Sequence, residues 1–279
     1  KIIFMSNISA SEVNKLRKST GAGMMDCKKA LEESSGNFEL AIEILRKKGQ
    51  KVAANRADRD SSEGVAIARV SSDKTMGVII SLNCETDFVA KNNTYIQLAN
   101  KLADLALGYN TKESFLSSKF DDKLTVNEKL TEQTGVIGEK IEIGSFKFLE
   151  ANYVGSYIHA GNKIASIVGL SYKDDNAEKV SKNIAMQVAA MNPIALDEHG
   201  VSKDILDKEI EIAKDQLRQQ GKPEAMLDNI VKGKIKRFLK DNTLVNQIFI
   251  KDNKINVSQY AFSINPKFSI TGFERISLQ

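Results

Sequence analysis

The sequence has few of the residues that build disulfide frameworks, metal centres and catalytic triads. Its 279 residues include two cysteines, Cys27 and Cys84, and two histidines, His159 and His199. Two cysteines cannot form a disulfide framework, and they suit a reducing compartment such as the cytoplasm. Because no cysteine or histidine is closely paired with another, we expect neither a structural zinc site nor a bound metal.

Long apolar runs and enzyme signatures are also missing. No segment approaches the roughly 18–20 apolar residues of a membrane-spanning helix, which argues against an integral membrane protein. The sequence contains no GxxxxGK[ST] loop, no GxSxG elbow and no HExxH pair. Gly21 and Gly23 follow a predicted helix instead of a strand, and Asp26 stands where a dinucleotide-binding loop needs glycine. We therefore expect a protein that is not an enzyme and has no cofactor.

Charge of one sign is not in large excess. Forty basic and thirty-six acidic residues give a net charge of +4, and 42% of the residues are hydrophobic. This composition is typical of a folded globular protein and does not favour direct nucleic-acid binding. A basic stretch at residues 232–240 has no interleaved aromatic residues for base stacking, so we interpret it as a solvated helix face.

The first part of the chain has the pattern of three short helices. Ser9 and Glu12 form a capping-box pair at the first, the second covers residues 24–34, and the third covers residues 38–48 and ends at Gly49. Consecutive Met24 and Met25 cannot share one helix face, so we expect one of them to pack inward and the other to be exposed. Residues 50–63 are polar and indicate a linker or a solvated helix. Met5 could be the natural start, so residues 1–4 are left out of the fold prediction.

The pattern then changes to strands followed by a helix, and it does so twice. Residues 65–70 and 77–82 predict a β-hairpin with a turn at 72–74, followed by a helix over 93–107. Residues 153–159 and 163–171 predict a second hairpin, followed by a helix over 176–191. The recurrence favours a duplicated α+β unit. Residues 201–240 predict two antiparallel helices joined at 220–223, and residues 268–276 predict a terminal strand.

The segment NCETDFVAK at residues 83–91 places a carboxylate and a large apolar side chain in a strand-to-helix turn. In one interpretation Asp87 caps the following turn and Phe88 fills the core of the hairpin. In the other, Phe88 is an exposed anchor with Asp87 as its acidic neighbour, of the kind that dominates protein–protein interfaces. The residue types alone leave both open.

Two long motifs resemble those of the elongation factor Ts family, which exchanges the guanine nucleotide of elongation factor Tu. They are LRKSTGAGMMDCKKAL at residues 16–31 and NCETDFVAK at residues 83–91. The shorter VIGEKI at 136–141 and GSYIH at 155–159 resemble two weaker family patterns. The sequence departs from the family at Ser81, where an acidic residue is general, and at Lys140, where asparagine is frequent.

The resemblance implies an α+β fold with an N-terminal three-helix module similar to ubiquitin-associated domains. It further implies two related α+β core subdomains, a protruding antiparallel helical hairpin and a C-terminal strand that returns to the core. We accordingly expect boundaries at residues 5–55, 56–147, 148–200, 201–240 and 241–279 for the module, the two subdomains, the hairpin and the C-terminal segment.

The resemblance also implies a partner and a set of contact residues. The partner is elongation factor Tu, GDP-bound or nucleotide-free, in the cytoplasm. Four residues would disturb the partner's magnesium and nucleotide site, and we call them the TDFV segment: Thr86, Asp87, Phe88 and Val89. Five further residues match secondary contact positions: Arg17, Met24, Met25, Ile137 and His159. The alternative function is that of an adaptor whose three-helix module binds ubiquitin-like or peptide partners.

Overall fold

The computed structural model describes residues 8–278, and their contacts divide them into two compact units. Of the described residues, unit 1 contains 8–67, Ile80–Phe146 and Leu278, and unit 2 contains Ala68–Ile79 and Lys147–Ser277. No helix among the described residues is both long enough and apolar enough to cross a membrane. Both helices and small sheets are present, which confirms the predicted α+β class.

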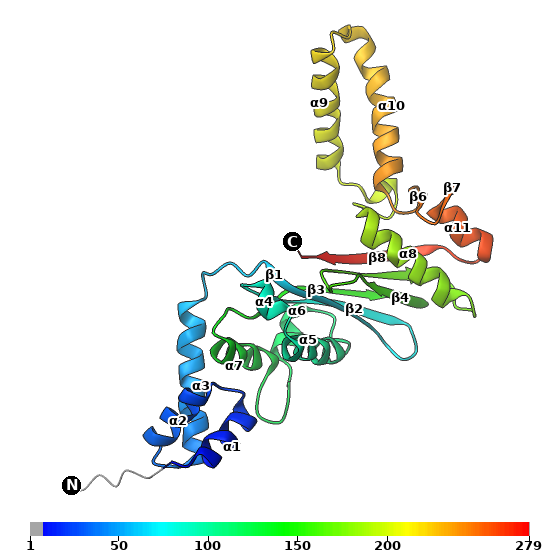
Figure 1. Ribbon diagram of the computed structural model, residues 1–279. Coiled ribbons are helices and arrows are strands. Elements are labelled where there is room, and N and C mark those ends of the chain that lie inside the picture. Colours follow the sequence, from blue (N-terminus) through cyan, green and yellow to red (C-terminus); the bar gives the residue numbers. More distant parts are fainter. Residues whose placement is uncertain (1–7, 279) are drawn as a thin grey trace. The chain divides into compact units, whose positions relative to one another are not determined.

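Three helices open unit 1: α1 (Ala10–Thr20), α2 (Met24–Glu33) and α3 (Phe38–Asn55) (Figure 1). The capping box predicted at the start of α1 is present, because Ser9 and Glu12 each accept a backbone hydrogen bond from the other. The three helices share a small apolar core formed by Val13, Leu16, Ala22, Cys27, Ala30, Leu31 and Ala41. The apolar faces that the sequence predicts for the three helices therefore pack against one another to form a small module.

Helix α3 continues beyond its predicted end at Gly49, so that prediction is wrong. The helix runs on to Asn55, and Gly49 is buried inside it. A methyl group added at Gly135, in α7 (Val126–Ile137), would lie 2.3 Å from the Cα of Gly49. The two helices therefore cross at a pair of glycines, and Gly49 permits a close approach instead of ending the helix.

Unit 1 also contains most of a three-stranded sheet in the order β1–β2–β3, formed by β1 (Glu63–Val70), β2 (Met76–Cys84) and β3 (Glu142–Glu150). After β2 come the one-turn helix α4 (Asp87–Ala90), the predicted helix α5 (Asn93–Ala106), and α6 (Lys112–Ser117). The hairpin of β1 and β2 and the helix after it confirm the first strand–strand–helix pattern. The sequence pattern did not predict β3, α6 or α7.

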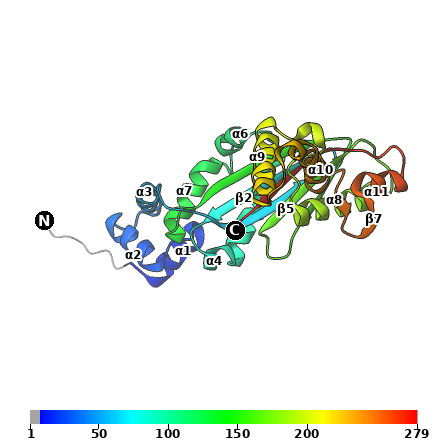
Figure 2. The same ribbon diagram turned by 90° about the horizontal axis from the view of Figure 1, so that it is seen from above.

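Unit 2 contains an antiparallel sheet in the order β4–β5–β8, formed by β4 (Tyr153–Ile158), β5 (Ile164–Leu170) and β8 (Ile270–Ser277). Helix α8 (Ala177–Met191) packs on this sheet (Figures 1 and 2). The second hairpin, its helix and the returning terminal strand are thus confirmed. The apolar core lies between α8, the sheet and α11 (Val257–Ile264).

The predicted helical hairpin consists of α9 (Lys203–Gln219) and α10 (Glu224–Asn242), with the short β6 (Ile248–Phe249) and β7 (Asp252–Asn256) following it. The single-turn helix η1 (Glu198–Gly200) precedes it. The two long helices bury Ala213, Leu217, Leu227 and Val231 in a core of their own. Figure 1 shows them side by side, joined at a turn that contains Gly221 in a left-handed conformation (φ 72°).

Candidate functional site

The TDFV segment presents its phenylalanine to solvent. It forms the start of α4, with Thr86 as N-cap, and the Thr86 hydroxyl accepts a hydrogen bond from the Val89 backbone at 3.5 Å. Phe88 is 83% exposed, whereas Ala90 on the other side of the turn is buried. The interpretation in which Asp87 caps the turn and Phe88 fills the core is therefore wrong. Phe88 is therefore available to contact a partner, as in the other interpretation.

Asp87 occupies the first helical position and forms an ion pair with Lys91, whose Nζ lies 2.6 Å from Oδ2. The hydrogen bond from Lys91 holds the pKa of the Asp87 carboxyl below its ordinary value, and the same contact raises the pKa of Lys91. Asp87 is therefore ionised at neutral pH. It is also accessible, so the carboxylate can exchange Lys91 for a group on a partner at small cost.

A carboxylate from another part of unit 1 holds the base of α4. The Glu139 carboxylate accepts hydrogen bonds from the backbone N–H of Glu85 at 3.1 Å, the backbone N–H of Thr86 at 3.0 Å and the Thr86 hydroxyl at 2.7 Å. Glu85 in turn accepts the Lys140 N–H at 2.7 Å, and Nη1 of Arg56 donates to both of its carboxylate oxygens at 2.7 and 2.8 Å. Hydrogen bonds therefore run in both directions between residues 85–86 and residues 139–140: Glu139 accepts from the first pair, and Lys140 donates to Glu85.

The contacts among Arg56, Glu85, Thr86, Glu139 and Lys140, which we call the brace, lie where two side chains have shifted pKa values. The Lys140 N–H, and to a smaller extent Arg56, hold the pKa of Glu85 below its ordinary value, so this carboxylate remains ionised. Burial raises the pKa of the Cys84 thiol, and its Sγ donates to the Thr86 carbonyl at 3.2 Å. The backbone leading into α4 is therefore fixed from several sides.

Ile137, one of the five predicted secondary contact residues, lies next to the TDFV segment. Ile137 and Val89 line a pocket of about 220 Å³, together with Gly21, Val136 and Tyr95 among others. Gly21 belongs to the turn between α1 and α2, and Val136 belongs to the last turn of α7. The N-terminal module, α7 and the TDFV segment therefore border one small apolar hollow.

The other N-terminal site residues are exposed. Met24 is 51% exposed and Met25 is 64% exposed, and Arg17 is also on the surface. The prediction that one of the two methionines packs inward is wrong. Ala22, in the turn before α2, joins Cys27 and the rest of the apolar core, so neither methionine is needed there. Both are free to contact a partner, and methionine adapts well to irregular surfaces.

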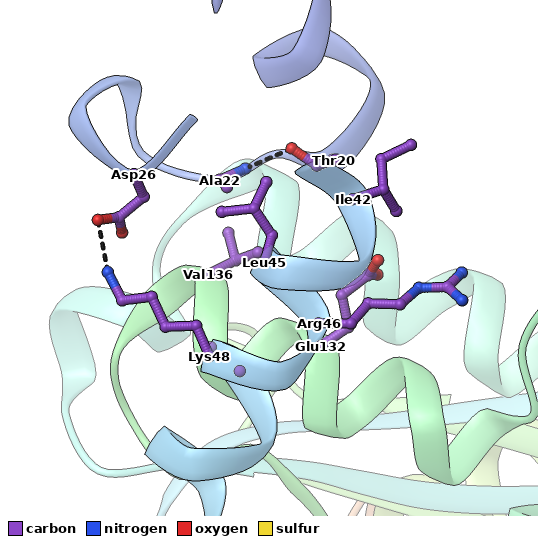
Figure 3. Close-up of a pocket in the computed structure, with 11 residues that line it drawn as sticks. Thr20, Ala22, Asp26, Ile42, Leu45, Arg46, Lys48, Glu132 and Val136 are labelled. Atoms are coloured by element: carbon purple, nitrogen blue, oxygen red, sulfur yellow. Dashed lines mark hydrogen bonds and ion pairs between the residues drawn. The ribbon is translucent and has the colours of Figure 1, made fainter. Parts of the chain in front are cut away.

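The N-terminal module rests on α7 beside a tight pocket of about 30 Å³ (Figure 3). Leu45 of α3 and Val136 of α7 both line this pocket, and Asp26 of α2 forms an ion pair with Lys48 of α3. The small volume indicates close packing of the module, not a ligand site.

His159 belongs to unit 2, where it follows β4 and is exposed. Its Nδ1 lies 3.0 Å from the Tyr157 hydroxyl, and the two rings are 6.0 Å apart. This contact links the exposed imidazole to Tyr157 of β4.

Sequence reasoning missed the bracing residues Arg56 and Glu139. The only signal was the VIGEKI pattern, in which Gly138 ends α7 in a left-handed conformation (φ 84°) just before Glu139. The structure also shows where the two departures from the family pattern lie. Ser81 is buried in β2, and its hydroxyl oxygen accepts the Ser145 N–H at 2.8 Å. The backbone N–H of Lys140 donates to the Glu85 carboxylate. Neither change removes a contact of the TDFV segment itself.

Comparison with known proteins gives one consistent result. The family model described as elongation factor TS matches residues 85–279. Elongation factor Ts of Christiangramia forsetii is 64% identical over 274 residues, covering 98% of this chain and all of the relative. The proteins of the same name from Flavobacterium psychrophilum and Amoebophilus asiaticus are 61% and 47% identical, covering 98% and 96% of this chain and 100% and 98% of the relatives. The chain therefore belongs to the elongation factor Ts family of translation elongation factors.

Proposed function

We propose that this chain binds GDP-bound elongation factor Tu in the cytoplasm and accelerates the release of GDP, so that GTP can replace it. It acts by binding and makes or breaks no covalent bond. The observation that carries the proposal is the 83% exposed Phe88 on a one-turn helix whose base is held by Glu139. A large apolar side chain presented on a fixed support is the form an interface anchor takes.

The physical basis of the exchange is thermodynamic linkage. If the chain binds nucleotide-free elongation factor Tu more tightly than the GDP-bound form, it must weaken GDP binding by the same factor. Bound magnesium neutralises phosphate charge and holds the switch loops of a GTPase, so displacing the support of the metal loosens the nucleotide.

The residues of the site would contribute to binding and to nucleotide release in different ways. Phe88 supplies apolar binding energy, and the ionised Asp87 acts near the partner's magnesium shell once it leaves Lys91. Met24 and Met25 on the N-terminal module add adaptable apolar contact area. Arg17 and Ile137 would add contacts to the same partner, and His159 of unit 2 would contact another part of it.

The test is stopped-flow release of fluorescently labelled GDP from elongation factor Tu, with increasing amounts of the chain. We expect the release rate to rise and then saturate, and magnesium chelation to reduce the difference between catalysed and uncatalysed rates. A release rate that does not change at any concentration would instead favour the adaptor function, in which only the three-helix module is used.

A further inference from the structure

Helix α4 is too short to be stable by its own hydrogen bonds. It contains four residues, Asp87–Ala90, and an isolated helix of that length does not form in water. Its one buried side chain is that of Ala90, which contributes little apolar area. Something outside the helix must therefore fix the direction in which Phe88 points.

The Glu139 carboxylate meets this requirement because it bonds to three donors at the helix start. One oxygen accepts the backbone N–H groups of Glu85 and Thr86, and the other accepts the Thr86 hydroxyl proton. Since that hydroxyl has a single proton, giving it to Glu139 leaves the oxygen lone pairs directed at the helix, where the Val89 N–H lies. The N-cap of α4 is thus set by a residue 53 positions further along the chain.

We propose that Glu139 is the positioning residue of the exchange reaction: it locks the N-cap of α4 and thereby holds Phe88 in its binding direction before the partner arrives. The inference rests on the proposed function. Preorganisation of this kind raises affinity, because the partner does not have to order the segment during binding. Gly138, with its left-handed backbone, is the turn that brings Glu139 from the end of α7 to the base of α4.

The chemistry of the contact predicts an order among variants. A glutamine at 139 keeps one carbonyl oxygen for the two backbone N–H groups, but its amide nitrogen cannot accept the Thr86 proton. An alanine removes all three contacts. The matched control is Glu128, at the other end of α7, whose carboxylate accepts the N–H and the hydroxyl of Thr125 at 2.8 and 3.0 Å. It makes the same kind of contact without touching α4.

The first measurement uses the free full-length chain and hydrogen–deuterium exchange. We expect the hydrogen-bonded amides of Thr86, Val89 and Ala90 to exchange about tenfold faster in Glu139→Ala than in the wild type, and less so in Glu139→Gln, since hydrogen bonds to a charged acceptor are among the strongest. Glu128→Ala should leave these amides unchanged. Equal protection of the Thr86, Val89 and Ala90 amides in the wild type and Glu139→Ala would overturn the inference.

The second measurement is a double-mutant cycle on GDP release from elongation factor Tu. Glu139→Ala should lower kcat/KM about tenfold, and the same substitution in a Phe88→Ala background should lower it less than about twofold, because Glu139 acts through Phe88. If the wild type accelerates release but Glu139→Ala matches Glu128→Ala, only the inference about Glu139 fails. If the wild type itself does not accelerate release, the proposed function fails and the exchange role of Glu139 fails with it.

Discussion

Truncating Phe88 to alanine should separate binding from folding. The side chain is 83% exposed in the free chain, so its removal should change the free energy of unfolding by no more than about 0.5 kcal/mol. If it is buried in the partner, its loss should cost the complex about 2–4 kcal/mol, the range for large aromatic side chains. That cost corresponds to a roughly 30- to 1000-fold higher concentration of the chain at half-maximal exchange.

The assay is labelled-GDP release over a wide concentration range, accompanied by thermal melting of the free protein. Phe262→Ala is a matched control, because Phe262 is 60% exposed but lies in α11 of unit 2. It should alter neither melting nor exchange by more than a small factor. The reasoning is refuted if Phe88→Ala melts clearly earlier, or if it reaches half-maximal exchange at the wild-type concentration.

Four other perturbations have distinct expected outcomes. Asp87→Ala should leave the half-maximal concentration near normal but lower the maximal release rate, since the proposed role of Asp87 is exerted as the nucleotide loosens; an unchanged maximal rate in stopped flow would exclude that role. Gly135→Ala places a methyl 2.3 Å from the Gly49 Cα and should lower stability by about 1–3 kcal/mol in denaturant melts, whereas Gly233→Ala, where an added Cβ meets nothing within 4 Å, should not. Replacing residues 204–238 with a Gly-Ser linker should leave one cooperative thermal transition, because the hairpin has a core of its own. The pKa of Glu85 is lowered in the folded state, so its stabilising contribution is complete above the ordinary glutamate pKa of 4.5 and is lost as the pH falls through the folded value; Glu85→Gln should flatten the stability–pH curve in that acid range.

Local periodicity was sufficient to predict most of the elements. Spacing placed Ile96, Ala99, Leu102, Ala103 and Ala106 on one face of α5; the last four are buried and Ile96 is half-buried. The hairpin of α9 and α10 turns where Gly221 and Pro223 interrupt the helical pattern. These features depend on neighbours within a few residues, which is the information that a single sequence contains.

Features that depend on distant contacts could not be predicted in the same way. A glycine near the end of a helical pattern indicates a C-cap. Gly49 instead lies where α3 crosses α7 closely at Gly135, and the residues near Gly49 in the sequence give no sign of that contact. The prediction for Met24 and Met25 was wrong for the same reason. Local spacing suggested that one of them is buried, whereas Ala22 from the preceding turn completes the apolar core of the three N-terminal helices. The proposed domain boundaries stay predictions for the same reason.

The candidate site combines both kinds of information. The motif identified the TDFV segment, and local helix signals could have shown that Thr86 is its cap. Only the folded chain shows that Phe88 is exposed while the backbone beneath it is bonded to Glu139. An exposed aromatic side chain on a mobile loop would lose much of its binding energy to ordering, and a rigid helix without an exposed anchor would offer little to bind. The two properties occur together at one short segment, and this supports the proposal that the segment recognises a partner.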